Sequence, residues 1–517
     1  MSQKFTSTIA GATIFISFVG LLSRGLGFIR EMIFANNFGL ETEFDLYLVG
    51  AVLPITINTI ILYIGQNYFI PVFHRINAEN HEESQKYYNQ SFMLFVAAGI
   101  FLAFLLFFLS NFIIDIYMHT ASQQSKETAT IIFKIFLITV PFAAGISMLS
   151  ALLQTVYEFK YPPISVLYLN MAVIIMIFAY TDKFGIFVIP IGYLVGTCIQ
   201  FFYLQLKSRK YFKFNLITHL RQFYFLKSII GSSLVIILMI ESIGQLYSIF
   251  DRYFYAHIST GGIASLNYAY IIFILPISIF SVSLATAVFP KITQAIVNSS
   301  KNDLERFYSE SISINILIFM PITFVLFYFG DTIIKIAFQR GKFLGESTTI
   351  TYNALKCYSV SLIFYSIYSV LNKMFYSMNL SKLLLIVTII GILLKLILNF
   401  LLVEPYQQYG LALSTSISFI FFFVVSYLII NTKMKITDKT IFVKEFCFYL
   451  INSFVCFGVI YIPMSLLSIK TISAEFGMIG IFVLVYMMNL VLLKHKSILL
   501  LKKVIQTIKY SGSTKSI

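Results

Sequence analysis

Apolar runs that are long enough to cross a membrane recur along the whole chain. A transmembrane helix needs about 20 consecutive, mainly apolar residues. Of the 517 residues, 58% are hydrophobic and only 11% are charged, whereas a soluble domain carries about 25% charged residues. Inside lipid every backbone N–H and C=O group must be bonded within the protein, which leaves a helix bundle or a closed barrel. The runs are continuous and do not alternate with a period of two, so we predict an all-α polytopic membrane protein.

The apolar runs predict about fourteen transmembrane helices. The loops between them are short, and none is long enough to fold as a soluble domain. Sugar polymerases and lipid-carrier glycosyltransferases usually need a large extramembrane region, so we expect a transporter and keep such an enzyme as the weaker alternative. The approximate ranges of the spans are 9–35, 47–73, 91–117, 130–154, 163–180, 184–206, 228–256, 264–289, 309–329, 352–377, 383–403, 409–430, 446–467 and 476–493.

The basic residues lie mainly on one side of this predicted topology. The formal net charge is +15, and with the N-terminus inside, most Lys and Arg residues of the loops and tails fall on the inner side. Both termini are therefore expected in the cytoplasm, and the distribution argues against a nucleic-acid partner. The densest cluster lies in the loop 207–227, which either anchors the topology beside anionic membrane lipids or binds a specific headgroup. Its members are Lys207, Arg209, Lys210, Lys213, Arg221 and Lys227.

An internal repeat relates two parts of the chain. When the stretch from Phe28 is laid over the stretch from Phe250 without a gap, several residues correspond. The shift equals an even number of predicted spans, so both halves should have the same orientation, as in transporters with parallel repeats. We predict two parallel six-helix lobes, 1–222 and 223–432, with two extra helices and a basic cytoplasmic tail in 433–517. The corresponding pairs are Arg30 with Arg252, Gly39 with Gly261, Asp45 with Asn267, and Leu53-Pro54 with Leu275-Pro276.

Charged residues inside the first span are candidates for substrate binding, because such residues are costly in a membrane and mark function by default. Arg24 and Arg30 flank Gly25 and Gly27, and two glycines this close permit a bend in a helix. A guanidinium suits phosphate because its planar fork makes two parallel charge-assisted hydrogen bonds. Either arginine could instead be structural, and Arg30 in particular could pair with Asp45 of the next helix.

A second group of charged residues lies in the spans of the second lobe. Asp251 and Arg252 are adjacent in the seventh span, so they point about 100° apart on a helix and cannot face one partner. Arg252 could reach a cavity between the lobes, where alternating access would take place. Lys395 lies in the middle of the eleventh span with Asn399 one turn later on the same face. Its ammonium could form a structural ion pair with Asp251 or with Glu241.

Metal and cofactor chemistry has no support in the sequence. The chain has no Gly-rich phosphate loop, and its six histidines are scattered near span ends or in loops. The cysteines show neither a CxxC pattern nor a Cys/His spacing typical of metal sites, and we interpret them as packing residues. We therefore expect no metal and no cofactor. The four cysteines are Cys198, Cys357, Cys447 and Cys456.

Several of these segments together resemble the MurJ (MviN) family of lipid II flippases. Residues 23–31 (SRGLGFIRE) are similar to the signature of the family's first helix, and Asp45 with Leu53-Pro54 is similar to the pattern that follows it. The resemblance implies the fold of the multidrug/oligosaccharidyl-lipid/polysaccharide exporter superfamily. It also implies a monomer in the bacterial cytoplasmic membrane that moves an undecaprenyl-pyrophosphate-linked precursor from the inner to the outer leaflet. The other similar segments are Asp251-Arg252, 262–269 (GIASLNYA), Leu275-Pro276, 284–290 (LATAVFP) and 338–343 (FQRGKF).

The chain departs from the family pattern at a few positions. MurJ-type proteins usually carry Arg just after the first Leu-Pro, where this chain has Ile57-Asn58, and many carry Arg where this chain has Ile271. Relatives with a sodium site have two polar ligands that align with Lys395 and Asn399, so an ammonium could replace the coupling ion here. With fewer cavity arginines, a flippase for O-antigen or capsule units is the alternative. A multidrug antiporter would favour acidic residues in place of Arg24 and Arg30.

Overall fold

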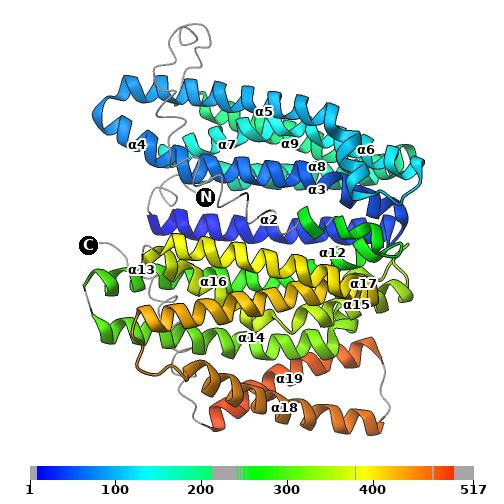
Figure 1. Ribbon diagram of the computed structural model, residues 1–517, viewed down its shortest axis with the longest axis vertical. Helices are drawn as coiled ribbons and strands as arrows, with labels where there is room; N and C mark the ends of the chain where they lie inside the picture. Colours follow the sequence, from blue (N-terminus) through cyan, green and yellow to red (C-terminus); the bar gives the residue numbers. More distant parts are fainter. Residues whose placement is uncertain are drawn as a thin grey trace. The chain divides into compact units, whose positions relative to one another are not determined.

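The fold is known from a computed structural model, which describes residues 9–211, 242, 245, 249–251, 253–298, 300–378, 380–467 and 471–493. All regular structure in these residues is helical (Figure 1). The chain divides into two compact units, Met1–Ala264 and Ser265–Ile517. The predicted lobe boundary at residue 222 lies outside the described residues, so the division at 222 and 432 stays a prediction.

The first unit contains most helices of the N-terminal half. The helix α6 is capped by Ser122, whose hydroxyl accepts a hydrogen bond from the Ser125 amide, and α5 is capped in the same way by Asn80. The elements are α2 Ile9–Phe38, α3 Thr42–Ile64, the π-helical turn η1 Gly65–Phe69, α4 Ile70–Glu79, α5 His81–Tyr117, α6 Gln123–Leu137, α7 Thr139–Thr155, α8 Tyr161–Phe184, η2 Gly185–Phe187, α9 Val188–Ser208 and η3 Phe254–His257.

The second unit contains the remaining helices, and α12 starts at the last residues of the first unit. Its two last helices pack on α14, where the ring of Phe324 stacks on Phe482 and the ring of Tyr328 stacks on Phe457. The elements are α12 Gly262–Pro276, the π-helical turn η4 Ile277–Ser281, α13 Val282–Val297, α14 Lys301–Phe338, α15 Gly345–Ser359, α16 Leu362–Ser377, α17 Ser381–Lys433, α18 Ile441–Leu467 and α19 Ile472–Leu492.

The helices are long and apolar enough to cross a membrane many times. Nine segments of the described residues meet this condition, or ten with the bent pair α15 and α16. Two of the nine, Tyr161–Ser208 and Ser381–Lys433, each contain two of the predicted spans. In the second, the chain leaves helical geometry at Gln407 (φ 48°), between the two spans. The prediction of an all-helical, multi-span membrane protein is confirmed, while the count of about fourteen stays a prediction because 228–256 lies largely outside the described residues.

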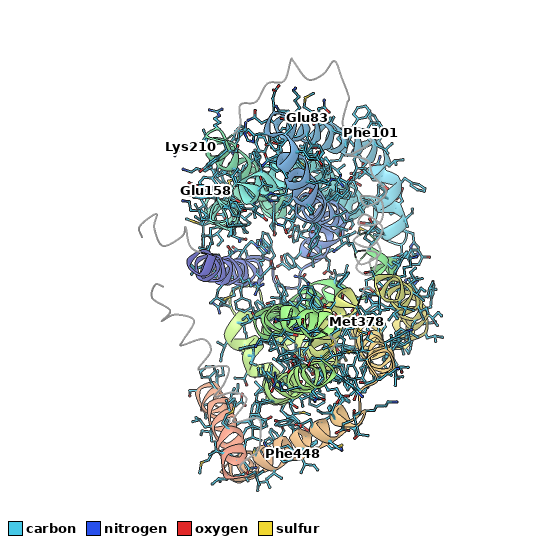
Figure 2. All side chains as sticks on the ribbon, turned by 90° about the vertical axis from the view of Figure 1, so that its left-hand side faces the viewer. Glu83, Phe101, Glu158, Lys210, Met378 and Phe448 are labelled. Atoms are coloured by element: carbon cyan, nitrogen blue, oxygen red, sulfur yellow. The ribbon has the colours of Figure 1, made fainter. Side chains whose placement is uncertain are left out.

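Exposed apolar side chains mark a lipid-facing surface on α5. Phe101, Phe104, Phe108 and Phe112 are 62–68% exposed and recur at helical spacing, and Phe101 lies at the edge of its unit in Figure 2. The helix α7, in contrast, is buried along almost its whole length. A helix that is apolar all round and enclosed by others belongs to the core of a bundle. The first unit therefore has an inner helix and an outer one that can face hydrocarbon.

The sequence repeat has a counterpart in the backbone. Gly39 and Gly261, which correspond in the repeat, both adopt the left-handed region, with φ of 54° and 80°, where glycine is favoured because it has no Cβ. In each copy the next helix contains a proline, Pro54 in α3 and Pro276 in α12, and then continues through a π-helical turn. This common pattern supports the repeat that the residues predicted.

Candidate polar and cationic site

Arg30 lies on α2 in a partly buried network within the first unit. Its Nη2 contacts Glu31 Oε1 at 2.7 Å, and its Nη1 donates to Asn170 Oδ1 on α8 at 2.9 Å. The guanidinium also lies over the rings of Phe34 and Tyr193, with its carbon 5.6 and 5.1 Å from their centroids. Aromatic faces attract cations through their quadrupole. Arg30 is thus held by a neighbouring carboxylate, an amide and two rings.

The expected alternative of an Arg30–Asp45 pair is wrong, because Arg30 is held by Glu31 and Asn170. The sequence interpretation did not single out Asn170 or Tyr193 as partners. A lone amide in the apolar run 163–180 was the available signal, since polar side chains in a span usually pair with one another. Arg30 Nε is buried and has no acceptor among the described residues. This N–H of the guanidinium is therefore still able to donate a hydrogen bond.

Arg24 is exposed on the same helix. Its neighbour Ser23 holds α2 against α8, since the Ser23 hydroxyl lies 3.5 Å from the Pro163 carbonyl and the Asn170 amide lies 3.5 Å from the Ser23 carbonyl. The helix α2 is continuous through Gly25 and Gly27, and the bend that these glycines permit stays a prediction. Arg24 and Arg30 are six residues apart, so they lie about 240° apart around a straight helix. They therefore project from different faces of α2.

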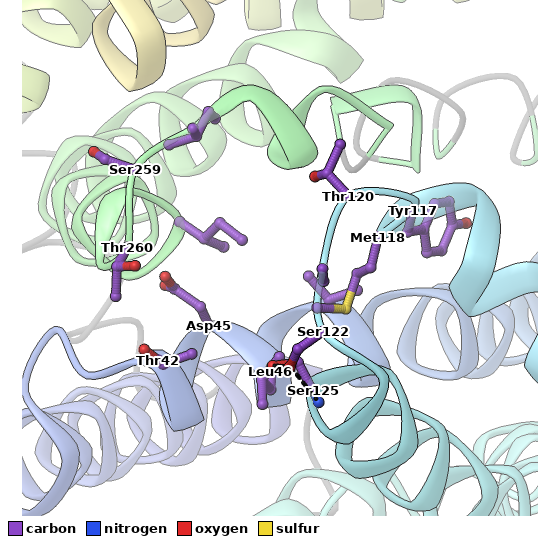
Figure 3. Close-up of a pocket in the computed structure, with 14 residues that line it drawn as sticks. Thr42, Asp45, Leu46, Tyr117, Met118, Thr120, Ser122, Ser125, Ser259 and Thr260 are labelled. Carbon is purple, nitrogen blue, oxygen red and sulfur yellow. Dashed lines mark hydrogen bonds between the residues drawn. The ribbon is translucent and has the colours of Figure 1, made fainter.

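Asp45 lies in the first turn of α3 and is 7% exposed. Its two carboxylate oxygens accept hydrogen bonds from the backbone amides of Gly261 (2.6 Å) and Ala264 (2.8 Å) at the start of α12. Figure 3 shows its side chain pointing toward the turn that carries Thr260. A carboxylate is stabilised there because the first amides of a helix lack intrahelical acceptors and its dipole favours negative charge.

A cavity of about 250 Å³ lies beside Asp45. Its walls come from the start of α3, the loop between α5 and α6, and the turn before α12 (Figure 3). Hydroxyl side chains dominate its polar lining. These are Thr42, Thr120, Ser122, Ser125, Ser259 and Thr260.

Lys395 and Asn399 lie on α17 in the second unit, and both are buried, with 2% and 0% of their surface exposed. The Ser414 hydroxyl, from the part of α17 beyond Gln407, donates to Asn399 Oδ1. The predicted juxtaposition of Lys395 and Asn399 one turn apart thus lies in the interior of the unit. A cation in such a place requires compensation by polar or charged groups.

The structure describes only some of the other predicted site residues. Asp251 is half-buried, whereas Arg252 and Glu241 lie outside the described residues. The predicted pairing of Lys395 with Asp251 or Glu241, and the role of Arg252 in substrate binding, stay predictions. Of the basic cluster in 207–227, the structure describes Lys207, Arg209 and Lys210 at the end of α9, and Lys210 lies at the surface in Figure 2.

These groups can bind anions and position helices. Within the described ranges, no three His, Cys, Asp or Glu side chains come together as metal ligands. A guanidinium can take phosphate oxygens, and that of Arg24 is exposed, whereas the Arg30 guanidinium is half-buried beside Glu31. The arrangement is suited to recognising a charged ligand without a covalent step.

Comparisons with known proteins agree over most of the chain. A family model described as lipid II flippase MurJ matches residues 34–487, and Arg24 and Arg30 precede this range. The lipid II flippase MurJ of Thermosipho africanus is 27% identical over 467 residues, which cover 88% of this chain and 91% of that protein. The probable lipid II flippase MurJ of Borreliella burgdorferi is 25% identical over 437 residues, or 81% and 83% of the two chains.

Solved structures share the fold. A lipid II flippase MurJ in an inward closed conformation matches with a TM-score of 0.78 at 24% identity and covers 93% of this chain and 99% of that one. An inward-facing multidrug resistance transporter of the MATE family matches with a TM-score of 0.66 at 16% identity, over 81% and 98% of the two chains. The family match therefore separates this chain from multidrug transporters, which the fold alone does not. The predicted transporter, rather than an enzyme, is confirmed, and the chain belongs to the lipid II flippase MurJ family.

Proposed function

We propose that this protein moves lipid II, an undecaprenyl-pyrophosphate-linked peptidoglycan precursor, from the inner to the outer leaflet of the bacterial cytoplasmic membrane by alternating access. The observation that carries the proposal is the family match over residues 34–487. Both termini are placed in the cytoplasm because the basic residues favour that side. The protein acts as a monomer in this proposal, with membrane lipids around it.

The cargo's diphosphate needs positive charge within a wet cavity. Moving an uncompensated charge through ~30 Å of hydrocarbon is too costly. Arg24 is the first candidate for this role because it is exposed on α2. Arg30 would have to exchange Glu31 or Asn170 for a phosphate oxygen, and Arg252 is the repeat-related candidate. Since residues 57, 58 and 271 carry no charge, Arg24 should contribute a large share of the phosphate binding.

The test is rescue of a bacterial strain depleted of its own lipid II flippase. We expect the unmodified chain to restore growth and to deliver lipid II to the outer leaflet, measured with a membrane-impermeant enzyme that cleaves lipid II. Failure of both readouts at normal membrane levels would overturn the proposed cargo. Rescue of a capsule or O-antigen transporter mutant in its place would identify the alternative cargo.

Variants of Arg24 test the phosphate site within the same assay. Arg24→Ala should abolish lipid II delivery, and Arg24→Lys should restore little of it, because Lys keeps the charge but loses the two-pronged contact. Lys183→Ala, at the end of α8, serves as a control for loss of a positive charge elsewhere. Full transport by Arg24→Ala at normal membrane levels would show that this charge is structural.

A further inference from the structure

A second cavity in the first unit, with a volume of about 370 Å³, lies between α3, α7, α8 and α9. This volume is within the range of small-molecule sites, about 300–1,000 Å³. No charged side chain is among the described residues that line it. Its polar lining includes three glutamines: Gln66 in η1, Gln154 at the end of α7 and Gln200 in α9.

The polar groups of this cavity have hydrogen-bonding capacity to spare. Ser150 is only 6% exposed, yet no described residue forms a hydrogen bond with its hydroxyl or with the side-chain amide of Gln154. Gln200 is 8% exposed and donates through Nε2 to Ser165 at 3.1 Å, which leaves its carbonyl oxygen for a ligand. Buried polar groups are costly unless they are bonded. The cavity is therefore suited to a polar guest.

The chemistry of the lining selects the kind of guest. Amide and hydroxyl groups supply both donors and acceptors without charge, so a diphosphate would find no counter-charge there. Phe159, Leu62 and Val166 add apolar surface to the walls. Pockets of this kind bind through apolar contact and use a few polar groups to fix orientation. A sugar ring, with hydroxyl and acetamido groups around an apolar face, matches this combination.

The cavity lies next to the segment of α2 that carries Arg24. Pro163 lines it, and the Pro163 carbonyl lies 3.5 Å from the hydroxyl of Ser23, the residue before Arg24. In a lipid-linked sugar the first sugar is bonded directly to the diphosphate. We propose that this cavity binds the first sugar of the cargo while Arg24 holds the adjoining diphosphate. This inference rests on the proposed function and assigns a subsite to it.

The experiment compares two probes that differ in their sugars. Affinities of lipid II and of undecaprenyl pyrophosphate, which has the same lipid and diphosphate without sugar, are measured on the full-length protein in lipid nanodiscs. The Ser150→Ala/Gln154→Leu double variant should bind lipid II about thirtyfold more weakly, since it loses two neutral hydrogen bonds of about 1 kcal/mol each. Its affinity for undecaprenyl pyrophosphate should stay within about twofold.

Two further variants complete the comparison. Arg24→Ala should weaken binding of both probes, and Gln85→Leu, which replaces a half-buried glutamine on α5 outside the cavity, should change neither. If the double variant does not fold, Gln66→Leu replaces it, because Gln66 is exposed.

Three results would overturn the sugar site. They are an unchanged affinity for lipid II in the cavity variants, an equal loss for both probes, and equal affinities of the two probes for the unmodified protein. Any of these results would mean that the cavity holds water and no sugar. The proposed function would then still be tested separately, by lipid II delivery in the rescue assay. If the unmodified protein binds neither probe, the proposed function and the sugar site fail together.

Discussion

At the scale of single residues, Arg30 and Arg24 differ in their surroundings although both come from one short motif. Arg30 has Glu31 at 2.7 Å and Asn170 at 2.9 Å, so much of its charge is compensated within the protein. Arg24 is exposed, and the helix positions six residues apart separate the two side chains. Of the two guanidiniums on α2, that of Arg24 is therefore the more accessible to a diphosphate.

Replacement of Arg30 should destabilise the protein more than replacement of a surface arginine. Arg30→Ala leaves Glu31 and Asn170 without their partner, which costs about 1–3 kcal/mol. Arg306→Ala is the control, because the Arg306–Asp303 pair is exposed and such pairs contribute less than about 1 kcal/mol. Thermal unfolding in detergent measures both.

A double variant separates stability from transport. Arg30→Met with Glu31→Gln removes the pair together and should recover much of the lost stability, because no unpaired charge remains. If lipid II delivery recovers as well, Arg30 has only a structural role. If stability recovers and delivery does not, the guanidinium is also needed for the cargo.

At the scale of elements, each repeat copy has a positive-φ glycine before a helix that contains proline and a π-helical turn. In the second copy the start of this helix is capped by Asp45 from α3 of the first. Gly261 is required there for two reasons: its φ is 80°, and a Cβ would lie 2.6 Å from the Leu40 carbonyl oxygen. The cap thus depends on the left-handed turn at Gly261 rather than on an ion pair.

Loss of this cap should be measurable. Asp45→Ala should lower stability by about 1–2 kcal/mol, as for other helix caps, and Asp45→Asn should lose less because its amide oxygen still accepts one hydrogen bond. Asp115→Ala, which breaks a contact between the exposed Asp115 and the half-buried Lys126, is the control. Equal thermal unfolding of Asp45→Ala and the unmodified protein would contradict a capping role.

At the scale of the whole molecule, the helices could be predicted from the sequence, but the side-chain contacts between them could not. Long apolar runs leave the backbone no alternative to helices in lipid, so α5 and α14 follow from composition alone. The contact between Arg30 and Asn170 joins residues 140 positions apart, and its register depends on how α2 packs against α8. The same holds for Asp45, whose acceptor role is satisfied by backbone amides that carry no signal in the sequence. Interior positions such as Lys395 were found because an ammonium stands out in an apolar run.

The topology of the chain is a prediction on the same scale. The inside excess of Lys and Arg places the loop 207–227 and both termini in the cytoplasm. Reporter fusions near Lys213 and after Lys503 should therefore report a cytoplasmic location, and a fusion in the loop around His119 should report the outer side. An external signal at Lys213 or Lys503 would refute the orientation or the number of spans.

The buried cation of Lys395 bears on how transport is coupled to an energy source. Lys395 is 2% exposed and lies one turn before the buried Asn399, and the resemblance to the family implies that these two positions hold the sodium ligands of some relatives. If this fixed cation stands in for sodium, lipid II transport by the unmodified protein should be the same in sodium, potassium and choline media. Lys395→Ala opens space and removes a buried positive charge, so any group that compensated this charge loses its partner. Sodium should then stimulate that variant, since a small ion can take the vacated place.

Transport in proteoliposomes with matched ionic strength measures this dependence. Lys382→Ala, at the exposed start of α17, is the control and should stay indifferent to sodium. Sodium-dependent transport by the unmodified protein would rule out the substitution of an ion by Lys395, and it would leave the fold and the family untouched. A Lys395→Ala variant that transports fully in all three media would assign the ammonium a role in packing alone. The apolar pattern of α17 does not show which energy source drives transport. The Lys395 measurements decide whether this flippase uses a sodium gradient or only the membrane potential, which acts on its cargo and on its own charges.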